Sequence, residues 1–447
     1  VCVAGLNGGM PGYTDVPCNF LMTGGVIEGN QASTGGGVYV NSNGVDLRAG
    51  LIADNRATNQ GGGIYVSTVP YTLHLSNAVI TDNTAAILGG GMWFCPTGDA
   101  VNHVTNGGAV FANHSDGAGD DFVAVPQTGK NHRVTLADRM LGGGEVQWYR
   151  DGGIAPNGVL GGNVLGEPNG SSRYAADDSA ERLIAISEET RGLALKALVS
   201  EAAQQLALEQ ATLQITGNSA LRGGGIGSNG GMIIGEKDEW TLTVTKAWDG
   251  VDEADYSEQE ITIYLKIGDY QLDGITLNQA NQWTAQFTQL PNPATLEDLS
   301  ISVLEAGTLY EASYSAVAID EAAKTLAITV TNRPKAQLTG NLTVSKRVSG
   351  SGADREKAFA FTVTLDDSTI VGKYGDMTFA DGVAQFTLKH GESKTAAALP
   401  AGVHYTVTED AETYQATAVG EQGVIQDKTT AQSVFNNYKG GGGTPPS

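Results

Sequence analysis

The sequence predicts an all-β chain: a right-handed parallel β-helix with a helical insertion, followed by two β-sandwich domains. Three observations lead to this prediction. A glycine-rich repeat fills much of the first half of the chain, and apolar and polar residues alternate strictly in the second half. The order of strand patterns in residues 236–335 then returns in residues 336–439, which indicates two related domains.

Length and composition limit the alternatives. A chain of 447 residues is too long for one hydrophobic core, and we expect three packed units. Its formal charge of −23 disfavours a nucleic acid or an anionic membrane as partner. No stretch approaches the roughly 20 apolar residues of a membrane span, so we expect no direct membrane insertion.

The repeat of residues 1–235 is visible when its glycine triplets are aligned. The copies read VIEGNQASTGGGVYV, LIADNRATNQGGGIYV, VITDNTAAILGGGMWF, FANHSDGAGDDFVAV and, after residue 212, LQITGNSALRGGGIGS. One asparagine holds the same place in every copy: Asn30, Asn55, Asn83, Asn113 and Asn218. The first four lie 25, 28 and 30 residues apart, a length that suits one coil of a parallel β-solenoid.

Each part of the repeat has an expected role. The glycine triplets permit the positive φ angles and the close backbone approach of a sharp corner, and the apolar residues after them form a strand. We expect each inward asparagine to bond to turn backbone and to the asparagine of the adjacent coil.

The segment between the fourth and fifth copies has a different character. It is rich in Ala, Leu and Glu at helical spacing, and it predicts a helix over about 178–211. We expect this helix to pack on the solenoid rather than to bind a partner. The leucines expected on its packed face are Leu183, Leu193, Leu195, Leu198 and Leu206.

Strand parity places unusual polar groups inside the first sandwich. Lys246 shares a face with Leu242 and Val244, Glu305 follows inward Val303, and Asn332 follows inward Val330. The second sandwich repeats the pattern with Lys346, Glu409 and Asn437. Burying such groups costs several kcal/mol unless they pair or react, so a chemical reason is expected for finding them twice.

These motifs resemble the Cna B-type and pilin isopeptide domains of Gram-positive surface proteins, which have an Ig-like fold. The likeness covers residues 236–439 and rests on LTVTKAW, LEAG and ITVTN, then on LTVSKRVSG, LPAGVHYTVTED and VFNN. It implies that Lys246 bonds covalently to Asn332 with Glu305 as the promoting acid. It likewise implies a Lys346 to Asn437 bond promoted by Glu409, both formed autocatalytically in a single turnover.

The implied chemistry is coherent, and two alternatives stay open. An apolar surround favours a neutral, nucleophilic lysine and an un-ionised acid that polarises the Asn carbonyl, with loss of ammonia. The adjacent Asn436 exchanges places with Asn437 if the strand register slips by one residue. The lysines also fit simple ion pairs with their glutamates and no covalent bond.

The β-helix offers candidate acids of its own. Asp54 and Asp82 precede equivalent asparagines, and Asp120 with Asp121 replaces two glycines. Turn capping, or at best a calcium site for the last pair, competes with a catalytic role. The histidines show no metal-ligand spacing, and we predict no metal and no cofactor; they are His74, His103, His114 and His132.

Aromatic residues occupy one position of the repeat. Tyr39, Tyr65 and Trp93 are expected to form a packed ladder, and they become a sugar-binding face if they are exposed. Three cysteines lie in the first hundred residues, and a bridge between Cys2 and Cys18 is left open by the sequence.

Together these features favour a surface adhesin or display protein of a Gram-positive bacterium, extracellular and on the cell wall. Its head is expected to bind a host or neighbouring-cell ligand, a glycan or glycoprotein, while residues 440–447 begin a linker toward a segment joined to peptidoglycan. The alternative is a carbohydrate-active β-helix enzyme on the same stalk, a polysaccharide lyase or hydrolase.

Overall fold

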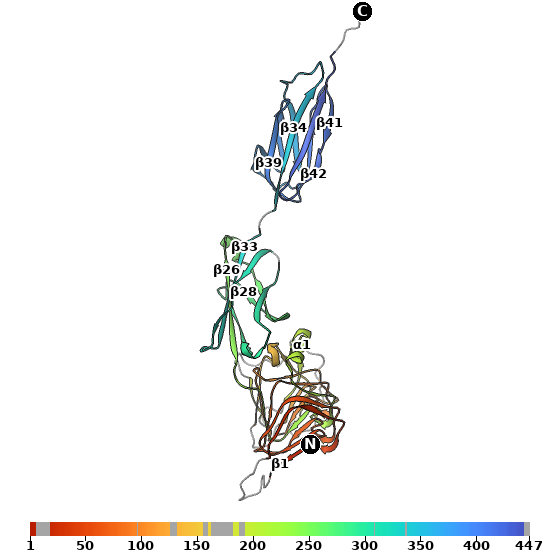
Figure 1. Ribbon diagram of the computed structural model, residues 1–447, viewed down its shortest axis with the longest axis vertical. Helices are drawn as coiled ribbons and strands as arrows, with labels where there is room; N and C mark the ends of the chain where they lie inside the picture. Colours follow the sequence, from red (N-terminus) through yellow and green to blue (C-terminus); the bar gives the residue numbers. More distant parts are fainter. Residues whose placement is uncertain are drawn as a thin grey trace, which may run out of the picture. The chain divides into compact units, whose positions relative to one another are not determined.

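The computed structural model describes residues 1–5, 18–95, 97–125, 132–154, 160–161, 182–186, 193–307, 309–335 and 338–441 (Figure 1). The chain divides into two compact units, 1–334 and 335–447, and each is described here by itself. Within the described residues no helix has the length and apolar character that crossing a membrane requires. The prediction of three domains with boundaries at 235 and 335 stays a prediction.

The N-terminal region is built from short strands of successive repeats that pair in parallel. We call the strands of one repeat a coil. One sheet contains, in spatial order, β1 (Cys2–Ala4), β4 (Val38–Asn41), β7 (Ile64–Val66), β24 (Ile226–Ser228), β11 (Met92–Phe94), β15 (Phe122–Ala124), β21 (Leu193–Leu198) and β17 (Gln147–Arg150). A second contains β14 (His114–Ser115), β10 (Thr84–Leu88), β23 (Ser219–Arg222), β6 (Arg56–Gln60) and β3 (Gln31–Thr34).

A third sheet completes each coil. It contains β13 (Gly108–Val110), β9 (Ala78–Thr81), β22 (Leu213–Thr216), β5 (Val45–Ala53), β8 (Thr72–Leu75), β25 (Gly231–Ile234), β12 (Asp99–Asn102), β16 (His132–Leu136) and β20 (Arg182–Ile186), with β2 (Phe20–Glu28) paired to β5. The antiparallel pair of β18 (Gly153–Ile154) and β19 (Leu160–Gly161) lies outside these sheets.

Backbone conformation explains the corners. The first glycine of a triplet has positive φ, as at Gly61 (65°) and Gly223 (66°), which confirms the predicted turn. The second glycine allows coils to approach, because a Cβ on Gly224 would lie 2.3 Å from the carbonyl oxygen of Thr84. The residue before each repeat asparagine also has positive φ, including Asp54 (54°) and Asp82 (56°), although neither is glycine.

The repeat asparagines form one continuous ladder, as the sequence predicts. Each side-chain amide nitrogen donates to the side-chain oxygen of the next asparagine, at distances of 2.8 to 3.0 Å. The order along the ladder is Asn30, Asn55, Asn218, Asn83 and Asn113. The expectation that consecutive copies are neighbours is therefore wrong at one place, because the fifth copy lies between the second and the third.

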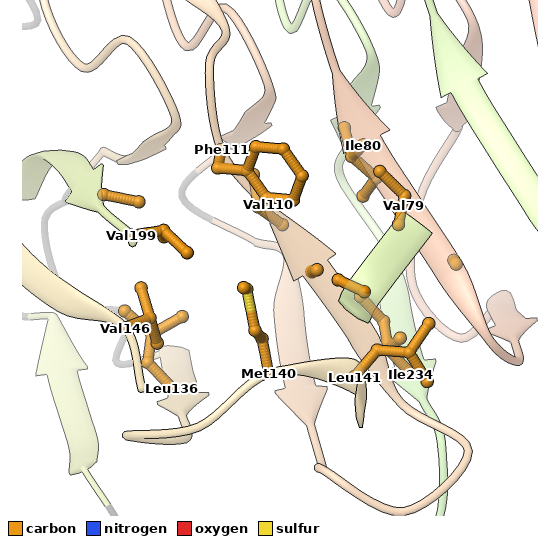
Figure 2. Close-up of a cluster of buried hydrophobic side chains, with 14 of the residues drawn as sticks. Val79, Ile80, Val110, Phe111, Leu136, Met140, Leu141, Val146, Val199 and Ile234 are labelled. Atoms are coloured by element: carbon orange, nitrogen blue, oxygen red, sulfur yellow. The ribbon is translucent and has the colours of Figure 1, made fainter. Parts of the chain in front are cut away.

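Inward side chains of the strands form one apolar core. Val38, Val40, Ile64 and Ile226 are completely buried between the sheets. At the end of the region near residue 140 the core is closed by Met140 and Leu141, which point toward Val110, Phe111 and Ile234 (Figure 2).

The predicted helix over 178–211 is largely wrong. Residues 182–186 and 193–198 are strands β20 and β21, which pair antiparallel with β16 and β15, and the helix α1 spans only Glu201–Gln210. The remaining residues of that range before 193 lie outside the described part. Ala and Leu favour a helix only weakly, and the open edges of two sheets offered a full ladder of backbone bonds instead. Leu195 and Leu206 are buried as predicted, whereas Leu198 is exposed.

The first sandwich contacts the N-terminal region directly. Arg139 is buried and makes a bidentate ion pair with Asp273, with distances of 2.7 and 2.8 Å. Helix α1 packs against β28 and against the short turn η1 (Leu141–Gly143) (Figure 1). The Tyr270 hydroxyl also donates to Glu209 of α1 at 2.5 Å.

The first sandwich has two facing sheets, and its first and last strands are neighbours in one of them. That sheet has the order β29 (Thr284–Leu290), β26 (Trp240–Trp248), β33 (Thr325–Pro334) and β31 (Tyr310–Tyr314), with β32 (Ala318–Asp320) also on β33. The other sheet has the order β28 (Tyr270–Leu277), β27 (Ile261–Ile267) and β30 (Ile301–Glu305). The connections include α2 (Glu253–Tyr256) and η3 (Pro293–Thr295).

The second sandwich repeats this design with sheets of four and six strands. One sheet has the order β39 (Ser393–Pro400), β34 (Thr339–Ser349), β43 (Thr430–Tyr438) and β41 (Gln415–Val419). The other has the order β36 (Gly372–Tyr374), β37 (Met377–Ala380), β38 (Val383–Leu388), β35 (Phe359–Leu365), β40 (His404–Glu409) and β42 (Gln422–Val424). In both sandwiches the first and last strands pair in parallel.

The order of the ladder can be tested by single substitutions. Asn218→Ala should lower the free energy of unfolding of the N-terminal region by about 1–3 kcal/mol, because it leaves neighbours on both sides without partners. Asn83→Ala should cost about the same, and Asn30→Ala clearly less, because Asn30 lies at the exposed end. Circular dichroism during urea unfolding measures these differences. An Asn218→Ala effect as small as that of Asn30→Ala would contradict the observed order.

Candidate functional site

Lys246 is buried inside the first sandwich. It lies on β26, where Leu242 and Val244 on the same face are fully buried, as the strand parity predicts. The side chain of Lys246 has no exposed surface, so its ammonium group must find a partner within the protein.

Two other strands supply that partner and a third group. Glu305 ends β30 in the facing sheet, and its Oε2 lies 2.5 Å from the Nζ of Lys246. Its Oε1 accepts a hydrogen bond of 2.7 Å from the Nδ2 of Asn332, which is fully buried on β33. One carboxylate thus bridges the amine of the first strand and the amide of the last.

The second sandwich brings the same three residue types together, but there both contacts are made by one carboxylate oxygen. Lys346 on β34 forms an ion pair with Glu409 of β40, and the Nδ2 of Asn437 donates to Glu409 Oε1 at 3.0 Å. Asn437 is fully buried, whereas its neighbour Asn436 is only half-buried and lies on the other face of β43. The structure therefore places Asn437 and not Asn436 beside the acid.

The strand register is identical at the two sites. In the first sandwich Lys246 lies opposite Val330, two residues before Asn332. In the second Lys346 lies opposite Phe435, again two residues before Asn437. Two sandwiches of different sequence therefore present an amine and an amide at the same diagonal spacing between their first and last strands.

Burial changes the proton affinity of both amines. Removal from water lowers the pKa of Lys246, although the hydrogen bond and the charge of Glu305 act in the opposite direction. The pKa of Lys346 is lowered for the same reason and is likewise held up by Glu409. A lowered lysine pKa increases the fraction of neutral amine, which is the nucleophilic form.

The orientation of the amides differs from the expected one. We expected the acid to donate to the Asn carbonyl oxygen, but at both sites the carboxylate accepts from the amide nitrogen. The side-chain oxygens of Asn332 and Asn437 are buried and have no hydrogen-bond partner. The carboxyl group thus faces the nitrogen that would leave as ammonia.

Both sandwiches match known families of domains. Residues 242–333 match the family described as Cna protein B-type domain, and residues 340–439 match a domain of unknown function, DUF7601. Residues 242–333 are a Cna B-type domain. The second sandwich, which the sequence likens to a pilin isopeptide domain, thus matches a family without an assigned role.

Two proteins of Streptococcus pyogenes share part of the chain. The chain is 38% identical over 108 residues to the pilus tip adhesin Cpa, covering 23% of this chain and 16% of that protein. It is 42% identical over 85 residues to a pilin of serotype M1, covering 15% of this chain and 25% of the pilin. The chain therefore spans a quarter or less of the length of these relatives.

Solved structures give a weaker likeness. The major pilin from Streptococcus pyogenes matches 45% of this chain and 99% of its own, at 18% identity and a TM-score of 0.25. The pilus-presented adhesin Cpa matches 38% of this chain and 36% of its own, at 23% identity and a TM-score of 0.21. TM-scores this low do not establish a shared arrangement of domains.

An aromatic side chain contacts the lysine of the Cna B-type domain and belongs to a cluster of rings, a feature that the sequence analysis missed. The Nζ of Lys246 lies 5.2 Å from the ring centroid of Trp248, and that ring stacks on Tyr256 at 4.5 Å. Trp283 and Tyr310 contact Trp248 edge-on at 5.1 Å. From the sequence, only Trp248 could be expected near Lys246, because the two lie on the same face of one strand. The other three rings come from other segments of the chain.

The candidate acids of the N-terminal region do not converge. Asp54 and Asp82 occupy the corners described above, and Asp121 continues the asparagine ladder. Its Oδ1 accepts from the side chain of Asn113 at 3.0 Å, and its Oδ2 accepts from the backbone of Ala197 at 2.8 Å. Asp120 forms an ion pair of 3.1 Å with Lys196. Asp54 and Asp82 thus belong to turns and Asp121 to the ladder, whereas Asp120 lies beside Lys196 and His114.

The histidines and aromatic residues also have local roles. His114 lies 3.3 Å from both Asp116 and Asp120, His74 is exposed, and His103 lies 3.8 Å from Glu239. The side chain of His132 lies outside the described residues. No group of three or more His, Cys, Asp or Glu side chains in the described part could hold a metal ion.

The aromatic ladder is interrupted. The rings of Tyr39 and Tyr65 lie 5.8 Å apart, but Gly227 of the fifth repeat lies between Tyr65 and Trp93. Tyr65 and Trp93 are 5% and 4% exposed, so neither provides a sugar-binding surface. Cys2 and Cys18 are exposed and not bridged.

The outer face of β6, β23, β10 and β14 contains a shallow groove of about 460 Å³. Most of its side chains are small, and its charged or titratable groups are Arg56, His114 and Asp116. Arg56, Asp116 and His114 are exposed. This groove is open to solvent, as is a hollow of about 720 Å³ whose lining includes Tyr39 and Tyr65.

Asp121 should make the stability of the N-terminal region depend on pH. Burial raises its pKa to about 6, above the ordinary value of 3.8, so the folded protein holds this proton more strongly than the unfolded chain does. Its stabilising contribution is complete below about pH 4 and is lost as the pH rises through 6, by up to about 3 kcal/mol. Asp121→Asn should remove this loss.

Urea unfolding between pH 4 and 7 measures the difference between the two chains. Asp116→Asn is a suitable control, because Asp116 is exposed and should leave the slope unchanged. If the unfolding free energy falls with pH as steeply in Asp121→Asn as in the original chain, Asp121 is not the cause of the fall.

Proposed function

We propose that this chain is part of a cell-wall-linked surface adhesin or display protein of a Gram-positive bacterium. Its N-terminal region would be a right-handed parallel β-helix that acts as the head, and its two sandwiches would form a stalk. The likeness to a streptococcal pilin and a pilus tip adhesin supports an extracellular location. Parallel pairing of successive repeats supports the β-helix, and the general right-handedness of parallel crossovers supports its hand.

The observation that carries the proposal is the repeated triad. We infer that Lys246 joins Asn332 and that Lys346 joins Asn437, each through an isopeptide bond. A ladder of hydrogen bonds alone would leave the stalk extensible, whereas a bond between first and last strands carries tension past the rest of each sandwich. Such a closure also restricts the unfolded chain as a disulfide does, in a region without cysteine.

The residues at each site can perform the reaction without another reagent. Glu305 takes one proton from the Lys246 ammonium, and the neutral amine attacks the Cγ of Asn332. A new C–N bond forms and the bond from Cγ to Nδ2 breaks. Of the three ammonium protons, one remains on the new amide, one leaves with the ammonia and one remains on the carboxyl.

Mass spectrometry of the intact purified chain tests both bonds. The mass should be lower than that calculated from the sequence by two ammonia molecules. Glu305→Ala, Lys346→Ala or Asn437→Ala should each restore one of them, and Asn436→Ala should restore none. A full calculated mass for the folded original chain would leave only ion pairs at these sites and would end the covalent proposal.

For the head we propose a glycan or glycoprotein ligand from a host or neighbouring cell. The groove around Arg56 and His114 supports this, because it is open and lined by small side chains and hydroxyl groups that match sugar hydroxyls. The enzyme alternative has less support, since Asp54 and Asp82 belong to turns and Asp121 to the ladder of the stack.

A glycan and mucin binding screen of the full chain tests the head. We expect binding that Arg56→Ala reduces at least about tenfold, the value of one charged hydrogen bond. Arg222→Ala, on the adjoining strand but outside the groove lining, serves as the control. Cleavage of a polysaccharide without stable binding would instead favour an enzyme.

A further inference from the structure

The fifth repeat, residues Leu213–Ile234, occupies an unexpected place in the stack. We call it the inserted coil. Each of its strands has a parallel neighbour on both sides. These neighbours are β5 and β9 for β22, β6 and β10 for β23, β7 and β11 for β24, and β8 and β12 for β25.

The strands that precede residue 212 leave a gap between two coils, which we call the slot, and the inserted coil fills it. Strand β8 ends at Leu75 and β9 begins at Ala78, yet these consecutive strands do not pair. Ser76 and Asn77 step across one coil height, and the carbonyl of Asn77 then accepts from the backbone nitrogens of Thr212 and Leu213, where the inserted coil begins. Without residues 213–234 the edges of two sets of strands would face each other unpaired.

Apolar and polar contacts both hold the inserted coil. Leu213, Ile215, Ile226, Met232 and Ile234 are at most 1% exposed. Asn218 bonds to Asn55 on one side and to Asn83 on the other. Removal of the coil therefore requires breaking two backbone ladders and exposing a continuous apolar surface.

The inserted coil is also the covalent link between the head and the stalk. Strand β25 ends at Ile234, and the first strand of the Cna B-type domain begins at Trp240. On its other side, α1 ends at Gln210, immediately before the coil, and packs against β28 of that domain. Side-chain bonds such as Arg139 with Asp273 and apolar packing also join the head to the first sandwich.

We propose that the inserted coil is the element through which tension along the stalk enters the head, and that its retention in the slot sets the load at which the head opens. Tension arriving at Trp240 acts first on Ile234 and the strands before it. Interruption of the chain order allows the loaded coil to be supported on both faces, whereas a coil at the end of the stack would be supported on one. The inference depends on the proposed isopeptide bonds in one respect only. These bonds would keep the sandwiches closed, so that the head opens before them.

Single-molecule stretching of the full chain tests the inference when the chain is held by its C-terminal end and by a site-specific handle at Thr58 in the outer groove. A handle at the N-terminal end would first detach β1, which is paired on one side only. We expect the first structural event in the head to release the inserted coil. Its residues, at about 3.3–3.6 Å each, would add roughly 75 Å. Asn218→Ala should raise the rate of this event at fixed load by roughly tenfold, the factor that corresponds to 1.4 kcal/mol.

The matched control is Asn113→Ala. Asn113 makes the same ladder bonds one coil beyond Asn83, away from the loaded coil. Its substitution should reduce the equilibrium stability of the head but leave the rate of the first event unchanged. Equal rates for the two variants would overturn the inference.

A crosslink provides a second test that does not weaken the fold. Thr84 and Ser219 are directly opposite on β10 and β23, both line the outer groove, and paired strands bring Cα atoms within disulfide range. Thr84→Cys with Ser219→Cys should shorten the first event to the release of residues 220–234, roughly 50 Å, when oxidised, and restore its full length when reduced. A first event of unchanged length in the oxidised chain would overturn the inference.

Failure of the proposed stalk would look different. If the isopeptide bonds do not form, extensions as long as a whole sandwich will appear, and Glu305→Ala will leave them unchanged. The short event and its response to Asn218→Ala can still be scored in such a chain.

Discussion

A buried asparagine amide nitrogen needs a hydrogen-bond acceptor, and in each module that acceptor joins a late segment of the chain to an earlier one. Asn218 binds between Asn55 and Asn83, although more than 160 residues separate it from Asn55. Asn332 and Asn437 lie on the last strand of their sandwiches, beside the first strand, and reach a glutamate of the facing sheet. In each module, therefore, a segment near the end of the sequence completes the hydrogen bonding of earlier strands.

The two sandwiches solve the burial of a lysine in the same way but with different surroundings. In the Cna B-type domain the amine lies near a cluster of four aromatic rings around Trp248. In the second sandwich Lys346 lies 4.4 Å from the ring centroid of Phe359. Since the register and the bridging carboxylate are constant while the aromatic side chains differ, the triad geometry is the conserved requirement between the two copies. Apolar enclosure can be supplied by whichever rings the loops provide.

Much of this arrangement could be predicted because it depends on short-range periodicity. Alternation along a strand placed Lys246 and Asn332 inside, and the aligned repeats identified the ladder asparagines. The stacking order could not be predicted, because every copy offers the same local pattern and spacing does not say which copies are neighbours. Strand β21 was missed because its composition favours a helix and only an open sheet edge makes it a strand. The cap formed by Asp121 depends on a contact with Ala197 from a distant segment.

The contrast between ladder and triad also explains why only the sandwiches are candidates for covalent closure. The ladder asparagines are bonded to one another and to backbone, and no lysine is bonded to any of them in the described part of the chain. Their amides therefore have partners but no nucleophile. At Asn332 and Asn437 a desolvated amine and a proton-accepting carboxylate meet the same functional group. Identical amide chemistry thus gives a reversible closure in the N-terminal region and the conditions for an irreversible one in the sandwiches.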